Sequence, residues 1–331
     1  MRRNWQNGIR SGTALMAAVL VAVPCALANP VWPPPPDQAR VEFVNEIRCE
    51  DLSPEAGFFG KIGRFLGGDD PDEKLGLPFA VLPVGEMLYL TCQNLPALVR
   101  IDPQEESYKL FRCGDSPLVT PVSLAACGDT VFVSDSGNGT VYRLIDGSLE
   151  PWITEGLVRP TGLAVSAADR AVYIVDTGDH QVKVFDLAGS MTGHIGRRGE
   201  TDDDLNFPTF AASAGTGILV NDTLNYRIKK FEGTGELLGA FGKEGNGPGT
   251  FSRPKGVAED RAGNIWVVDA LFDNIQIFDP SGRLLLIVGR SGQAPGEFWS
   301  PAGIGMTKDL IYVADTFNNR IQVLKNLGGG S

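Results

Sequence analysis

The sequence predicts an all-β protein built from one repeated unit, and two observations support this class. Six segments of similar sequence follow one another along most of the chain. Glycine and proline are abundant, with 41 and 22 of the 331 residues, and they separate short apolar runs as turn residues do. Hydrophobic residues make up 43% and charged residues 21%, which is ordinary for a globular protein.

Each repeated segment has the pattern of a strand, a polar turn and a second strand. The last copy, "IYVADTFNNRIQVL", starts at residue 311, and related copies start at 131, 172, 218 and 265. A weaker copy starts at 88, where Cys92 replaces an aspartate. The aspartate positions lie 41–47 residues apart and comprise Asp135, Asp176, Asp222, Asp269 and Asp315. Because a turn aspartate accepts nearby backbone N–H groups, we assign these five a structural role rather than an acid–base one.

Two further strands complete each unit. A proline-led strand precedes the pair, as in "RPTGLAV" at 159, "FPTFAAS" at 207, "RPKGVAE" at 253 and "SPAGIGM" at 300. A fourth strand follows it, as in "ELLGAFG" at 236. Four antiparallel strands in this period are typical of one blade of a β-propeller. One blade cannot bury its apolar faces alone, so the sequence predicts a six-bladed β-propeller.

The last blade has only three strands near the C-terminus, and the stretch "ARVEFVNEI" at 39–47 has no blade of its own. We expect this N-terminal strand to complete the last blade and close the ring, because closure removes an unpaired sheet edge. The propeller then spans residues 39–325, and residues 326–331 form a flexible tail.

Residues 1–28 have the pattern of a signal peptide. Three arginines precede an apolar run, and Ala26-Leu27-Ala28 supplies small residues for cleavage after Ala28. The alternatives are an uncleaved anchor and lipidation at Cys25. With cleavage, we expect an exported protein, periplasmic or extracellular, without a membrane span. Residues 29–38 are proline-rich and predict a linker before the propeller.

An insertion at 50–76 interrupts the repeats, and the spacing of its apolar residues predicts a short helix. The mature chain keeps four cysteines, which allow two disulfides in three pairings. Of these we favour Cys49–Cys92, since both lie near one rim if the N-terminal strand joins blade six. Free or buried thiols are the alternative.

The repeats resemble those of the NHL family. The quoted copies match its pattern of P-x-G-V, then a strand, then D-T-x-N-x-R-I-Q-V-F, and the match is strongest in the last three copies, across roughly residues 75–325. The N-terminal leader is also similar to that of exported bacterial six-bladed members. The resemblance implies an axial site in those members that are enzymes, using calcium or zinc.

The sequence offers few groups for such chemistry. The residues that start the innermost strands include neither acids nor amides, which a calcium site needs. Two histidines, His180 and His194, fall short of the three that a zinc lyase would use, and we expect both at the surface. We therefore predict no catalytic residue, metal or cofactor.

A net charge of −11 disfavours nucleic-acid binding. What remains is a binding face of aromatic and basic residues, the types that anchor interfaces. Its candidate residues are Arg159, Phe207, Tyr226, Arg253, Lys255, Phe272, Trp299 and Phe317. We expect a monomeric, non-catalytic binding or scaffold module for a protein or small ligand of the cell envelope. The alternatives are a metal-dependent lyase or hydrolase with an axial site, and a carbohydrate or peptide sensor.

Overall fold

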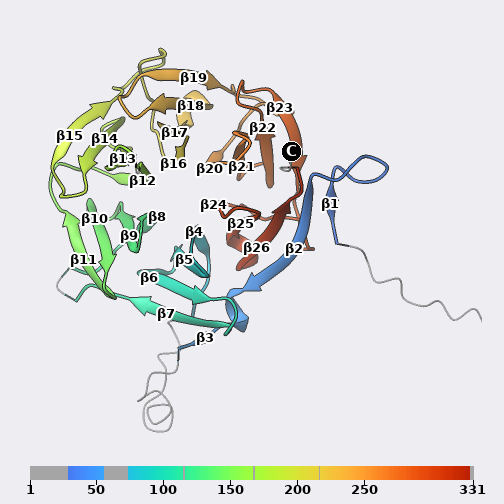
Figure 1. Cartoon of the computed structure of the whole chain (residues 1–331), viewed down its shortest axis with the longest axis horizontal. Coiled ribbons are helices and arrows are strands. Elements are labelled where there is room, and N and C mark those ends of the chain that lie inside the picture. The colour runs from blue at the N-terminus through green and yellow to red at the C-terminus, as the bar shows by residue number, and fades with distance from the viewer. Residues whose placement is uncertain (1–28, 56–73, 115, 167, 216, 329–331) are drawn as a thin grey trace, which may run out of the picture.

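The computed structural model describes residues 29–55 and 74–328, except for 115, 167 and 216. The signal peptide expected at 1–28, most of the helix expected at 50–76 and the end of the tail lie outside these residues. The described chain forms six sheets arranged as a ring around one axis, as Figure 1 shows. The predicted six-bladed all-β fold is therefore confirmed.

Each blade has four antiparallel strands, and its first strand lies nearest the axis (Figure 1). Blade one has β4 (Pro78–Val84), β5 (Met87–Cys92), β6 (Leu95–Asp102) and β7 (Ser107–Phe111). Blade two has β8 (Pro121–Cys127), β9 (Thr130–Asp135), β10 (Thr140–Ile145) and β11 (Ser148–Ile153). Blade three has β12 (Pro160–Ser166), β13 (Ala171–Asp176), β14 (Gln181–Asp186) and β15 (Met191–Ile195).

The remaining blades follow the same order. Blade four has β16 (Ala211–Ala214), β17 (Gly217–Asp222), β18 (Arg227–Glu232) and β19 (Leu237–Phe241). Blade five has β20 (Pro254–Glu259), β21 (Ile265–Asp269), β22 (Asn274–Phe278) and β23 (Leu284–Val288). Blade six has β24 (Ile304–Met306), β25 (Leu310–Asp315), β26 (Arg320–Asn326) and, from the N-terminal end, β2 (Val41–Arg48).

The strand β2 pairs antiparallel with β26, from Val41 opposite Asn326 to Arg48 opposite Arg320. The sequence placed this strand at 39–47, close to its observed bounds. A short strand β1 (Val31–Trp32) adds to the outer side of β2, and Trp32 packs against the buried residues between blades five and six. This part of the expected proline-rich linker is therefore joined to the sheet, because the indole ring finds apolar surface there. Beyond β2, a 3₁₀ turn (Cys49–Asp51) leads to β3 (Ser53–Pro54), which pairs parallel to β7.

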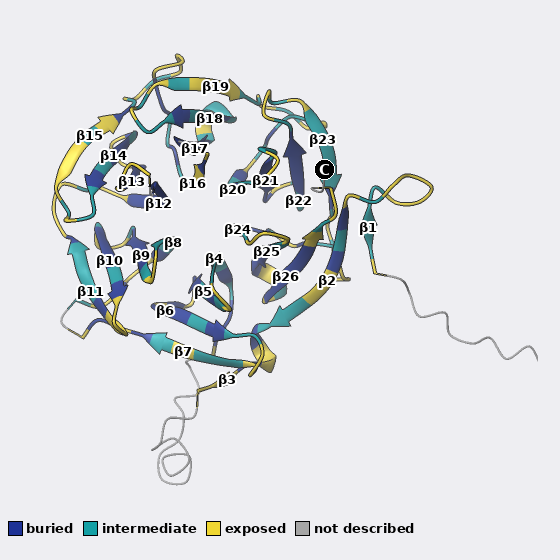
Figure 2. Cartoon of the chain, in the orientation of Figure 1, coloured by how far each residue is buried: buried dark blue, intermediate teal, exposed yellow. Residues whose placement is uncertain are grey.

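In the described part of the chain, the core consists of six apolar clusters, and each lies between two neighbouring blades. Between blades three and four, for example, Tyr173 and Val175 meet Ile218 and Phe231. Figure 2 shows the buried residues on the inner strands and more exposed residues at the outer ones. Burial of apolar surface contributes about 25 cal/mol per Å² to the stability of a fold. Because this burial takes place between blades, it stabilises the ring rather than any single blade.

Polar bonds also join the blades near the axis. At most junctions a side chain at the end of one blade's second strand, or just after it, donates to a backbone oxygen at the start of the next blade. Examples are Thr316 Oγ1 to Pro78 O at 2.8 Å and Asn221 Nδ2 to Pro254 O at 2.7 Å. The glycine of the P-x-G motif allows this close approach, because a Cβ on Gly256 would lie 2.6 Å from the Ala302 oxygen.

Candidate binding face and axial cavity

The repeated aspartates fix one end of the ring, where the turns between second and third strands meet the starts of the innermost strands. In blade three, the carboxylate of Asp176 accepts the backbone N–H groups of Val158 and Arg159 at 2.9 and 2.7 Å. The aspartates of blades two and five accept the same two N–H groups, whereas those of blades four and six accept only the first of them. All five side chains are buried: Asp135, Asp176, Asp222, Asp269 and Asp315. The contacts are those of structural turn residues, as the sequence predicts. They hold two sets of loops together as one face.

A proline introduces the innermost strand of each blade, and the residue just before it makes one of two contacts. In blades two, three and five, the N–H group of this residue bonds to the aspartate of its own blade. In the other three blades, the residue has positive φ, between 46° and 50°, and its N–H bonds to a side chain of the preceding blade. The three pairs are Leu77 with Asn319, Phe207 with His180, and Ser300 with Asp273.

One of these contacts corrects a prediction. His180 is not a surface residue, because its side chain is buried and its Nδ1 accepts the Phe207 N–H at 3.1 Å. The Phe207 ring packs against the imidazole with 4.2 Å between ring centres. Burial, and to a lesser extent Arg198, lower the pKa of His180. His194, by contrast, is exposed on β15.

The same end of the ring carries a set of exposed apolar side chains, which we call the apolar rim. They stand just before the innermost strands or in the turns after the aspartates: Val119, Val158, Leu224, Leu271, Trp299 and Phe317. Trp299 and Phe317 lie edge to face, with ring centres 5.7 Å apart. The sequence predicted these two aromatic residues but not the four aliphatic ones, because valine and leucine in strand-rich repeats are expected in the core. Their position next to the turn aspartates was the available signal.

The other predicted face residues differ in what they can offer a ligand. Arg159 and Arg253 are exposed. Tyr226 takes a left-handed conformation and packs on the cluster between blades four and five, and Phe207 is committed to His180. Phe272 is half-buried. The structure thus brings the exposed Trp299 and Phe317 together and uses Tyr226 and Phe207 mainly for packing.

An axial cavity of ≈ 350 Å³ lies inside the ring. All six innermost strands contribute to its wall, largely with alanine, glycine, valine and leucine. Phe210 lines it near the rim end, and Glu259 lines it toward the opposite end, where the carboxylate forms an ion pair with Lys230. Among the described residues, no cluster of three or more histidine, cysteine, aspartate or glutamate side chains is placed to hold a metal ion.

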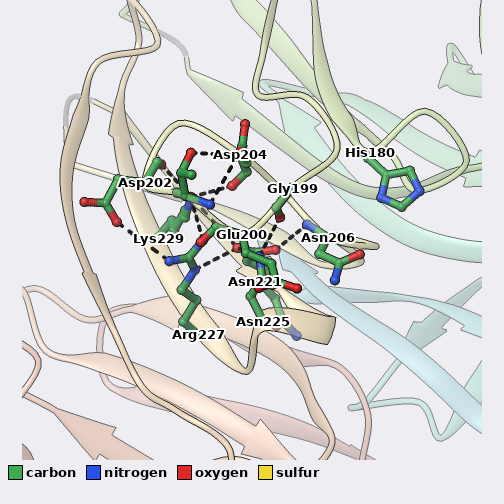
Figure 3. A network of polar contacts seen from close by, with 12 residues as sticks. His180, Gly199, Glu200, Asp202, Asp204, Asn206, Asn221, Asn225, Arg227 and Lys229 are labelled. Carbon is green, nitrogen blue, oxygen red and sulfur yellow. Dashed lines mark hydrogen bonds and ion pairs between the residues drawn. The ribbon is translucent and has the colours of Figure 1, made fainter.

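A polar network fixes the connection from blade three to blade four (Figure 3). The buried Lys229 ammonium donates to the backbone oxygens of Thr201, Asp202 and Asp204. Beside it, Arg227 donates to Asp222 at 2.9 Å and to the Thr201 oxygen at 2.7 Å. Burial and the nearby Arg227 lower the pKa of Lys229. This acidic loop is therefore held by cations of its own blade.

The four described cysteines are free thiols, so the disulfide expected between Cys49 and Cys92 is not formed in the structure. Both side chains lie in the apolar cluster between blades six and one. Burial raises the pKa of the Cys49 thiol to about 12, and it also raises the pKa of Cys92. The thiols pack there as small apolar groups.

Comparison with known proteins agrees with this architecture. The NHL repeat family model matches residues 157–185, which contain the first two strands of blade three and most of the third. No curated protein sequence gives a significant match.

Several solved structures share the fold at low sequence identity. A structural genomics protein of unknown function from Bacteroides thetaiotaomicron VPI-5482 has a TM-score of 0.64 and 15% identity, over 86% of this chain and 75% of its own. Virginiamycin B lyase from Staphylococcus aureus has a TM-score of 0.58 and 13% identity, over 76% of this chain and 96% of its own. An auxiliary nutrient binding protein from Bacteroides ovatus ATCC 8483 has a TM-score of 0.60 and 13% identity, over 76% and 69%.

At these identities the likeness concerns the fold alone. Within the described residues, no helix is long and apolar enough to cross a membrane. The blade count, the ring topology and the matched segment lead to one description: the chain is a six-bladed β-propeller with an NHL repeat in its third blade.

Proposed function

We propose that this chain is an exported, non-catalytic module that docks a protein partner of the cell envelope through the apolar rim. The observation that carries this proposal is the distribution of exposed large apolar side chains. Six of the eleven such residues in the described chain belong to the rim, at one end of the ring. They come from blades two to six, and exposed apolar side chains gathered at one end of a fold favour an interaction site there.

The composition of the face supports a protein partner. The edge-to-face pair of Trp299 and Phe317 in blade six offers aromatic surface. Arg159 and Arg253 are exposed at the same end of the ring, just before the innermost strands of blades three and five. Aromatic residues and arginine are enriched among the residues that dominate binding energy at protein interfaces. Export rests on the composition of residues 1–28, and its test is the N-terminal sequence of the mature protein, which should begin at Asn29 after cell fractionation.

The docking proposal is tested with two double variants. Trp299→Ser with Phe317→Ser removes the aromatic part of the rim, whereas Met191→Ser with Leu238→Ser removes two exposed apolar residues from the outer strands β15 and β19. A partner captured from a cell-envelope extract and then purified should bind the wild-type chain saturably. We expect at least about tenfold weaker binding by the rim variant, since a hot-spot aromatic residue contributes about 2 kcal/mol or more, and unchanged binding by the outer-strand variant. Equal binding by both variants would contradict the proposal.

The alternative function, a metal-dependent lyase or hydrolase, is tested separately. Elemental analysis of the purified protein should find no stoichiometric zinc or calcium if the binding function is right. One tightly held ion per chain, together with its loss in a cavity variant, would favour the enzyme.

A further inference from the structure

Three side chains from different blades meet at the rim end of the axis. Lys255 stands near the start of β20 in blade five, and its Nζ lies 5.2 Å from the centre of the Phe79 ring in blade one. Phe79 in turn lies 5.8 Å, centre to centre, from Phe210 in blade four. Blade six separates blades five and one along the ring, so the lysine reaches across the mouth of the axial cavity.

The charge on Lys255 has no partner in the described protein. The structure shows neither a hydrogen bond nor an ion pair to its Nζ among the described residues, and its contact is the face of Phe79. Lys255 is partly buried, whereas the described cations with fully buried side chains are all paired: Lys183 with Asp176, Lys229 with backbone oxygens, and Arg320 with Asp315. A partly desolvated ammonium without a counter-ion is unfavourable. Lys255 therefore differs from the buried cations of this fold, each of which has a polar partner.

The surroundings of Lys255 favour an anion from outside. Burial, and then the exposed Arg253, lower the pKa of Lys255 to about 8, so the amine is still largely protonated at neutral pH. The protein as a whole carries a net charge of −11, and the positive mouth is therefore a local feature rather than a general attraction for anions. No described carboxylate is bonded to this amine.

The cavity below the lysine suits an apolar body. Its wall near the mouth includes Phe210, Ala80, Leu163 and Ile304. Its volume of ≈ 350 Å³ falls in the range of small-molecule sites. The Glu259 carboxylate toward the other end is already paired with Lys230, so the unpaired Lys255 ammonium sets the orientation of an amphipathic anion.

We propose that the axial cavity binds a small organic carboxylate, with its carboxylate paired to Lys255 and its apolar body inserted past Phe79 and Phe210. The aromatic rings contact the body near the head group, and the Lys255 ammonium supplies a charge-assisted hydrogen bond. This site is separate from the apolar rim that we propose for protein docking, and neither proposal depends on the other.

The test uses three probes of similar size on the full mature chain. Phenylacetate carries the anion, phenylacetamide is neutral and phenethylamine is cationic. Isothermal titration calorimetry at pH 7 should show binding of phenylacetate, at least about tenfold weaker binding of the amide and none of the amine, because a charge-assisted bond is worth about 1.5–3 kcal/mol. Raising the pH from 7 to 9.5 should weaken phenylacetate binding, since the ligand stays ionised while Lys255 loses its proton.

Matched variants assign the effect to the lysine. Lys255→Met keeps an apolar stem without the charge and should bind phenylacetate and phenylacetamide alike. Lys308→Met removes an exposed lysine from the turn between β24 and β25 and should behave as wild type. If Lys255→Met does not fold, as judged by circular dichroism, Lys255→Gln takes its place.

The outcomes are decisive in both directions. No binding of phenylacetate up to millimolar concentration, equal binding of the three probes, or undiminished binding by the Lys255 variant overturns the proposal. The Trp299→Ser and Phe317→Ser variant should bind phenylacetate as wild type does, so that failure of the docking function and failure of this site are distinguishable.

Discussion

Blades four and six build the same turn from nearly the same letters, "DTLNYR" at 222–227 and "DTFNNR" at 315–320. In both, a 3₁₀ turn (Thr223–Asn225 or Thr316–Asn318) leads to a residue in the left-handed region. In both, the arginine Nε donates to the turn aspartate, at 2.9 Å from Arg227 and 2.8 Å from Arg320. The local sequence therefore determines the local structure in the same way twice.

The surroundings of the two arginines differ. The side chain of Arg227 is 16% exposed, whereas that of Arg320 is 1% exposed. Glu46 of β2 covers Arg320 with a contact of 2.5 Å, and the backbone oxygens of Gln293, Ala294 and Glu297 accept its other donors. The eight residues of β2 extend alongside the turn, while β19 in blade four has five residues and ends before it. Blade six, whose outer strand comes from the other end of the chain, thus has the longer outer strand and the more deeply buried guanidinium.

The largest expected effect comes from removing the two arginines in turn. Arg320→Met leaves the carboxylates of Asp315 and Glu46 without their shared cation, and we expect a loss of about 3–5 kcal/mol in the free energy of unfolding, as for other broken buried pairs. Arg227→Met should cost about 1–2 kcal/mol, because its donors are partly solvated. Urea unfolding followed by circular dichroism gives both values. Equal losses would show that the closure does not depend on Arg320 more than an ordinary blade depends on its own arginine.

A smaller effect isolates the contact between the two ends of the chain. Glu46→Gln keeps the shape of the side chain but removes its charge, and we expect a loss of about 1–2 kcal/mol, since the partner guanidinium is buried. The matched control is Glu150→Gln, whose partner Arg143 lies in the same blade and is partly exposed. This control should cost less than about 0.5 kcal/mol. A double-mutant cycle with Arg320→Met should show coupling for Glu46, and additive losses would contradict a direct contribution of this contact.

The difference between these arginines also indicates what the sequence can predict. The blade count and the N-terminal strand follow from spacing, because every unit must pair its edges and bury its faces. The burial of Arg320 depends on whether β2 reaches the turn, and the covering residue Glu46 is 274 residues away in the chain. Comparing one repeat with another does not reveal this contact. The same limit applies to the site. Trp299 and Phe317 stand out as aromatic residues, whereas the role of Lys255 depends on Phe79, which comes from a different blade.

The smallest expected effect is on the pH dependence of stability. It concerns two junctions between blades where the same position of the repeat carries different side chains. His180 and Asn319 both occupy the left-handed position after their turns, and each accepts an N–H group from the residue before the next blade's first proline. Asparagine does not titrate, but the His180 Nδ1 accepts only while the ring is neutral. Burial lowers the pKa of His180, so the unfolded chain binds a proton more readily than the folded one.

The sign of the pH dependence follows from that difference. The stability contributed by His180 is present above the unfolded pKa of about 6.5 and is lost as the pH falls toward the lower pKa of the folded state. The wild-type chain should therefore lose stability between pH 7.5 and 5 by more than the His180→Asn variant does, as measured by thermal midpoints across this range. His194→Asn, at an exposed position on β15, is the control and should keep the wild-type pH profile. If His180→Asn and the wild type have parallel profiles, protonation at this junction contributes nothing, and the two junctions are equivalent despite their different side chains.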